Sequence, residues 1–251
     1  MLPNNIFINS NNKESIIKEL NSKYIGGILN YLAWKKDIEG ISAFSVEDII
    51  KSLGMKPNSH KGKINEKIFD IIIDLRDREY INKLIINEKN YNGFSSCVLN
   101  ILSLNSNNTA YNYIKITDYE KNKIFNYDKQ KIDKIMLFNL YCHLKARMYK
   151  RENNYSLSIT GGKAQVCYPS YESIENDILI KPSTIKKYID ILIDIDLIRY
   201  DNAGTYIKEG NKYKSSNTYV LYDKDGEWKY ELEQGIKFFR KLKENDGYRF
   251  I

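Results

Sequence analysis

Cysteine, proline and glycine are all scarce in this chain. Its 251 residues include four prolines, 13 glycines and three cysteines, Cys97, Cys142 and Cys167. The cysteines are odd in number, widely spaced and without a Cys-x-x-Cys pair, which argues against a disulfide scaffold and a zinc knuckle. So few prolines and glycines argue against a collagen-like or linker-dominated chain.

Long apolar runs are also missing. No stretch reaches 18 uninterrupted apolar residues, so the sequence predicts no membrane-spanning segment. Residues 1–12 lack the basic and apolar regions of a signal peptide. We therefore expect a soluble protein of the reducing cytoplasm without a membrane partner.

The chain has only two histidines, His60 and His143. A Ser/His/Asp or Cys/His site needs a histidine oriented by a third group, and Cys142 directly precedes His143, so the two would diverge on a helix. The His-hydrophobic-His metal pair of rolling-circle nucleases is absent. Gly161-Gly162-Lys163 lacks the spacing of a phosphate-binding loop. These absences argue against nucleotide hydrolysis and covalent catalysis.

One group of carboxylates could still serve catalysis. Asp190 and Asp194 are four residues apart on one helical face, with Asp196 close behind, and such a pair could hold Mg²⁺. The alternative is a solvated helix face that runs into a turn, and no further acidic motif supports a nuclease or primase. We predict a protein with no catalytic residue, metal or cofactor.

What the sequence does contain is a sizeable apolar fraction and a surplus of basic residues. Hydrophobic residues make up 42% of the chain and aromatic residues 13%, enough for a core and unlike a disordered chain. There are 39 Lys and Arg against 32 Asp and Glu, a net charge of +7. The surplus is greatest in residues 111–222, with 18 basic and 13 acidic residues.

An internal repeat relates the two halves of the chain. Residues 45–49 (SVEDI) match 170–174 (SYESI), and Lys56-Pro57 matches Lys181-Pro182 at the same offset of 125 residues. The second copy reads as a helix over 171–177 capped by Ser170, a turn, and a helix over 182–195 that begins with a proline. Short β segments at 197–200, 205–207 and 218–222 follow, with a polar loop over 208–216.

The first copy follows the same order. The pattern predicts an upstream helix over 23–32, a capped helix over 45–53, a longer turn, a helix striped by isoleucines from residue 64, and a hairpin over 80–87 and 95–104. A helix over 129–149 is expected upstream of the second copy. Residues 227–245 predict an amphipathic helix that packs on the second domain or pairs two protomers.

The segments Pro169-Ser170, Ser183 to Tyr188 (STIKKY) and Leu197 to Tyr200 (LIRY) resemble the winged-helix superfamily of DNA-binding domains. Two such domains in about 250 residues are similar to the tandem winged-helix initiators of plasmid and phage replication. The resemblance implies an α+β fold with two tandem winged helix-turn-helix domains, at 1–110 and 111–222, and a C-terminal helix at 223–251. It also implies that the partner is double-stranded DNA and that the protein is located at the nucleoid or on a plasmid. A homodimer and replisome proteins as further partners are left open.

A recognition helix reads base edges with its N-terminal residues, and the surrounding cations contact phosphates. In the second domain, which we expect to be the main DNA reader, the candidates are Lys181, Ser183, Thr184, Lys186, Lys187 and Tyr188 on the helix and Lys208, Asn211, Lys212 and Lys214 on the wing. In the first domain they are Ser59, His60, Lys61, Lys63 and Lys67. The alternatives are solvated surface lysines, a transcriptional regulator of the same fold, and a protein–protein adaptor of the replication or segregation machinery.

Overall fold

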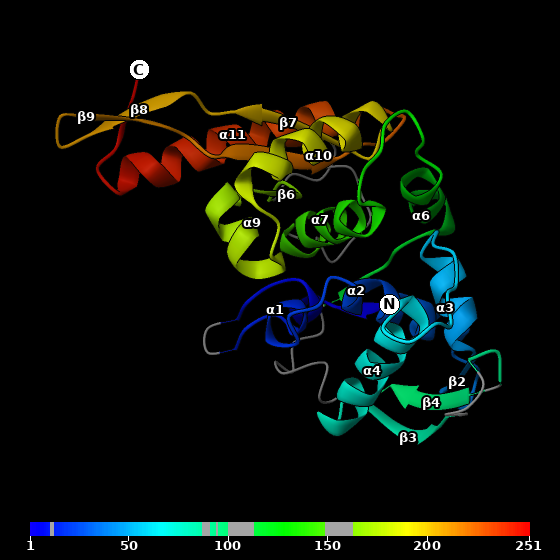
Figure 1. Cartoon of the computed structure of the whole chain (residues 1–251). Helices are drawn as coiled ribbons and strands as arrows, with labels where there is room; N and C mark the ends of the chain where they lie inside the picture. Colours follow the sequence, from blue (N-terminus) through cyan, green and yellow to red (C-terminus); the bar gives the residue numbers. More distant parts are fainter. Residues whose placement is uncertain (11–12, 87–90, 94, 100–112, 149–162) are drawn as a thin grey trace. The chain divides into compact units, whose positions relative to one another are not determined.

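The computed structural model describes residues 1–10, 13–86, 91–93, 95–99, 113–148 and 163–251, and shows a mixed α+β chain with small antiparallel sheets (Figure 1). The chain divides into two compact units. One comprises Met1–Ala146 with Asn176–Ile180, and the other comprises Arg147–Glu175 with Lys181–Ile251. This grouping places residues 113–146 in the first unit and the C-terminal helix in the second. Within the described ranges, no helix is both long and apolar enough to cross a membrane.

The first unit contains several helices and strands besides its three-stranded sheet. Ser15 caps α1 by accepting the N–H of Lys18, and Thr117 and Glu120 form a reciprocal capping box at the start of α6. The two-residue strands β1 and β5 pair with each other. The bounds are β1 Leu2–Pro3, η1 Asn4–Ile6, α1 Ile16–Glu19, β5 Tyr113–Ile114, α6 Asp118–Phe125 and α7 Lys134–Arg147.

The rest of the first unit contains three helices and a three-stranded antiparallel sheet. In chain order they are α2 Ile25–Lys35, β2 Ile41–Phe44, α3 Val46–Ser52, α4 Ile64–Asp77, β3 Ile81–Ile85 and β4 Ser95–Leu99. The last strand lies between the other two, in the order β2-β4-β3. Isoleucines and leucines at helical spacing on α4, including Ile68, Ile72 and Leu75, are fully buried, which explains why this segment folds as a core helix.

The second unit repeats this order of elements around a sheet with the strand order β6-β10-β7. Its central strands and helices are β6 Val166–Cys167, α9 Tyr171–Ile178, α10 Pro182–Asp194, β7 Ile198–Asn202 and β10 Asn217–Leu221. The last strand again lies between the first two. The sequence repeat is also a structural one, since Ser45 accepts the N–H of Asp48 and Ser170 accepts the N–H of Ser173, each at the start of the corresponding helix.

The segment expected to be a polar loop at 208–216 is instead part of a second small sheet. Strands β8 Thr205–Lys208 and β9 Asn211–Lys214 form a hairpin, and the C-terminal strand β11 Arg249–Phe250 adds to β8, giving the order β11-β8-β9. The hairpin turns at Glu209 and Gly210, both with positive φ, which glycine tolerates without strain. The polar composition of β9 gave no strand signal in the sequence, because cross-strand hydrogen bonds rather than burial of side chains stabilise this strand.

The helix α11 Glu227–Asn245 packs on the sheet of the second unit, which confirms the first of the two roles expected for it. Val166, Val220 and Leu232 form a buried cluster with Ala164 between the helix and the strands. Gly235 allows the helix to approach β6 closely, since a Cβ there would lie 2.7 and 2.9 Å from the methyl carbons of Val166. In Figure 1, α11 runs alongside the strands from β7 to β8.

Candidate nucleic-acid interface

Helix α10 has one buried face and one polar face. It begins at Pro182, after Lys181 in an extended conformation, and a proline at the first position suits a helix start because its missing N–H is not needed. Ile185, Ile189 and Leu192 are almost completely buried and fix which face points inward. The outward residues near its N-terminus are Lys181, Ser183, Lys186 and Lys187, all exposed.

The structure removes one residue from the predicted base-reading set. Tyr188 is only 4% exposed and lies on the buried face of α10, so its ring is not presented to a ligand. Its position three residues after Ile185 accounts for this, because such spacing places both side chains on one face. Thr184 is half-buried, and its N–H donates to the carbonyl of Lys181.

The three aspartates at the end of α10 do not converge on a cation site. Asp190 and Asp194 are exposed on the helix, whereas Asp196 follows it with a φ of 50° and forms an ion pair with Arg199. Within the described ranges, no three His, Cys, Asp or Glu side chains are placed to hold a metal ion. The arrangement fits the solvated helix face that the sequence also allowed.

The β8–β9 hairpin places its four candidate residues on two different faces. Lys208 lies opposite Asn211, and Lys212 lies opposite Ile207. Because neighbouring residues of a strand point to opposite faces, Lys208 and Asn211 share one face and Lys212 and Lys214 the other. The Lys208 ammonium donates to the Tyr248 hydroxyl at 3.3 Å, and this hydrogen bond raises the pKa of Lys208.

In the first unit, the predicted residues all lie exposed at the N-terminal end of α4: Ser59, His60, Lys61, Lys63 and Lys67. The turn before the helix is held by buried Asn65, whose Oδ1 accepts the N–H of Asn58 at 2.6 Å. Glu66 accepts the N–H of Gly62, so a carboxylate of the chain itself occupies this helix start. Asp70 and Asp74 are exposed farther along the same helix.

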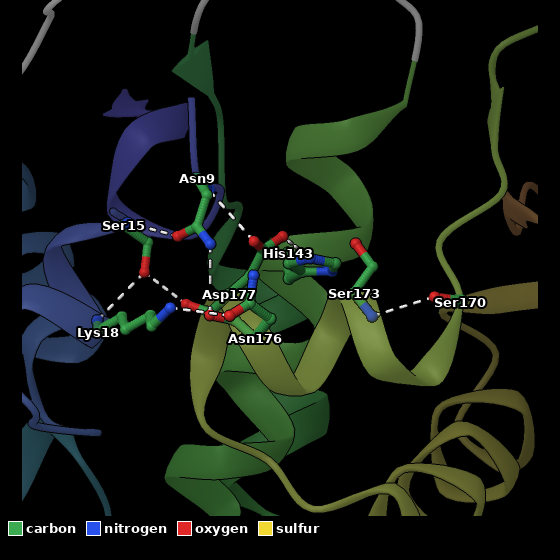
Figure 2. A network of polar contacts seen from close by, with 8 residues as sticks. All are labelled: Asn9, Ser15, Lys18, His143, Ser170, Ser173, Asn176 and Asp177. Carbon is green, nitrogen blue, oxygen red and sulfur yellow. Dashed lines mark hydrogen bonds and ion pairs between the residues drawn. The ribbon is translucent and has the colours of Figure 1, made fainter. Parts of the chain in front are cut away.

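A buried polar network in the first unit was not anticipated from the sequence (Figure 2). His143 on α7 is 0% exposed, and its Nε2 lies 2.8 Å from Oδ2 of Asp177, which is 2% exposed. Oδ1 of Asp177 accepts a hydrogen bond from the N–H of Asn9, and the backbone carbonyl of Asp177 accepts one from the hydroxyl of Ser15. Because these residues are far apart in sequence, no local pattern could have joined them.

This network has a structural rather than a catalytic form. The Ser15 hydroxyl donates to a backbone carbonyl and caps α1, so it does not face the imidazole as a nucleophile would. Lys18 donates to Oδ1 of Asn176 at 2.8 Å at the exposed edge of the network. The contacts fasten the chain near residues 9–18 to α7 and to residues 176–177.

Comparisons with protein families, curated proteins and solved structures find no match for this chain.

Proposed function

We propose that this chain is a tandem winged-helix protein that binds specific double-stranded DNA and initiates plasmid or phage replication without catalysis. The exposed N-terminal half of α10 is the observation that carries the proposal. Ser183, Lys186 and Lys187 lie on one outward face at the start of a helix whose other face is buried. A helix of this kind can enter the major groove with those side chains directed to base edges and phosphates.

The order of elements around α10 supports the same proposal. A short capped helix, α9, precedes α10 by three residues, and the antiparallel strands β7 and β10 follow with a hairpin between them. This is the arrangement expected of a winged helix-turn-helix, with β8 and β9 as the wing. The first unit has the same strand order and an equivalent pair of helices, α3 and α4.

The second unit is the stronger candidate for the main DNA reader. On α10, the lysines at 186 and 187 precede the first exposed aspartate, so the helix start is cationic. On α4, Glu66, Asp70 and Asp74 follow the basic turn closely, and their carboxylates oppose a deep approach to phosphate. We assign the first unit a supporting contact with DNA through residues 59–63.

The choice of replication initiation over transcriptional regulation rests on the resemblance to tandem initiators. Both roles require duplex binding and differ in the location of the site. The test is to titrate the chain with duplex fragments from the flanks of its own gene, against scrambled duplex, across a salt series. We expect one fragment that contains repeated sites to bind most tightly, with a steep decrease of affinity at higher salt.

The result also separates the alternatives. A preferred fragment that holds a promoter without repeats indicates a regulator. Affinity weaker than about micromolar for every fragment, without the salt dependence of phosphate contacts, contradicts DNA binding and favours a protein–protein adaptor.

A further inference from the structure

The small sheet β11-β8-β9 has two accessible faces of different chemistry. No side chain of its three strands is fully buried, and the strands contain no aspartate or glutamate. Residues directly opposite each other on antiparallel strands share a face. The strand register therefore determines which side chains lie together.

One face is aromatic. Phe250 lies opposite Tyr206, and Tyr206 lies opposite Tyr213, so the three rings form a row across the strands. Their centroids are 5.6 and 5.7 Å apart, within the range of favourable ring contacts. Lys208 and Asn211 share this face. The row stiffens a hairpin that would be only marginally stable by itself.

The other face is cationic. Arg249 lies opposite Ile207, Ile207 opposite Lys212, and Thr205 opposite Lys214. Lys212, Lys214 and Arg249 are exposed, and in the part of the chain that the structure describes none of the three has an ion pair. Three cations thus share one small face, and the strands that form it contain no carboxylate side chain.

The aromatic face lies on the side of α11. The guanidinium of Arg240 on α11 is 5.4 Å from the centroid of Phe250, and its Nε donates to the carbonyl of Ala203 at 2.9 Å. Tyr248, just beyond α11, meets Tyr206 edge-on with a centroid distance of 4.9 Å. The cationic face therefore points away from α11.

We propose that Lys212, Lys214 and Arg249 form a phosphate-binding surface for duplex DNA, completed by the C-terminal strand β11. The inference rests on the proposed function and extends it to a residue outside the wing hairpin. A guanidinium can bind a phosphate with two parallel N–H groups, whereas an ammonium acts as a point charge. Lys208 is excluded from this surface, because it lies on the aromatic face and is bound to Tyr248.

The test compares three multiple variants of the full chain, and two single variants of Arg249, by the salt dependence of their affinity for duplex DNA. The first carries Lys212→Ala, Lys214→Ala and Arg249→Ala. The matched control, Lys229→Ala, Lys237→Ala and Lys241→Ala, removes the same charge from exposed positions of α11. The third carries Lys186→Ala and Lys187→Ala. Each phosphate contact contributes about 0.9 to the slope of log affinity against log salt.

We expect the cationic-face variant to reduce the slope by about 2.7 and the α11 control to leave it unchanged. Arg249→Ala alone is expected to reduce it by about 0.9, and Arg249→Lys to retain most of it. Thermal unfolding of each variant, compared with the wild-type chain, verifies that the fold is retained.

Two other results are distinguishable. If the cationic-face variant keeps the wild-type slope while Lys186→Ala and Lys187→Ala reduce it, this surface is not a phosphate contact and the proposed function stands. If the wild-type chain itself shows no salt-dependent affinity for duplex DNA, the proposed function fails, and the inference fails with it.

Discussion

Replacing Asp177 by alanine tests whether the buried network of Figure 2 stabilises the first unit. The carboxylate lies 2.8 Å from His143 Nε2 and accepts the N–H of Asn9 at 3.3 Å, and both His143 and Asp177 are almost completely buried. Removing one partner of a buried, hydrogen-bonded pair of ionisable groups costs about 3–5 kcal/mol, because the remaining polar group stays in a medium of low polarity. Native domains are stable by only about 5–15 kcal/mol.

The expected loss is therefore a large part of the stability of the first unit. With about 2–4 °C for each kcal/mol in a chain of this size, Asp177→Ala should lower the unfolding temperature by roughly 6–20 °C. Circular dichroism melts of the full chain measure this shift. Asn176→Ala is the matched control, since its exposed Oδ1 accepts a hydrogen bond from Lys18 at the edge of the network, and it should change stability by less than about 0.5 kcal/mol.

A double substitution sharpens the test. Asp177→Ala with His143→Leu removes both polar partners and should recover part of the loss, because replacing both members of a buried pair costs less than removing one. A melt of Asp177→Ala within about 1 kcal/mol of wild type would refute the reasoning.

Three further predictions concern packing, acid stability and capping. Gly235→Ala should destabilise the second unit by about 1–3 kcal/mol in denaturant unfolding, because the new Cβ meets Val166, while the adjacent Gln234→Ala should have little effect. Burial raises the pKa of Glu120, but Lys145 and the hydrogen bonds from Lys145, Thr117 and Tyr141 outweigh it and hold that pKa below its usual value. The stabilisation is present above the unfolded-state pKa and is lost as pH falls through the lower folded-state pKa, so Glu120→Gln should lower stability at pH 7 and flatten the acid unfolding curve. Ser45→Ala and Ser170→Ala should each cost about 1 kcal/mol in the same unfolding assay, and a cost below about 0.3 kcal/mol would contradict their capping role.

Local sequence patterns predicted the main helices of both copies. The pattern at Ser170 and Pro182 placed α9 and α10 within one residue of their observed ends, and the amphipathic stretch at 227–245 matches α11. These signals are local, because caps, prolines and helical spacing act within a few residues. Helix α6 was not predicted, although the capping box formed by Thr117 and Glu120 is a local sequence signal for its start.

Features that depend on distant pairing could not be predicted in this way. The strands β6 and β11 have two residues each and exist only through their partners β10 and β8. The division of Lys208, Lys212 and Lys214 between two faces of the hairpin follows from the register of β8 and β9, which no local sequence pattern determines. Arg249 could not be predicted as a candidate either, because its place depends on the pairing of β11 with β8. Tyr188 was a wrong candidate, because it lies on the buried face of α10.

The most direct test of DNA binding through α10 is the salt dependence of affinity for the preferred duplex fragment, measured for wild type and for Lys186→Ala with Lys187→Ala. The control, Lys237→Ala with Lys241→Ala, removes the same charge from α11. We predict that the α10 variant loses specific binding and that the slope of its residual binding is smaller by about 1.8, while the control binds as wild type does. An α10 variant with unchanged affinity and unchanged slope would contradict the account.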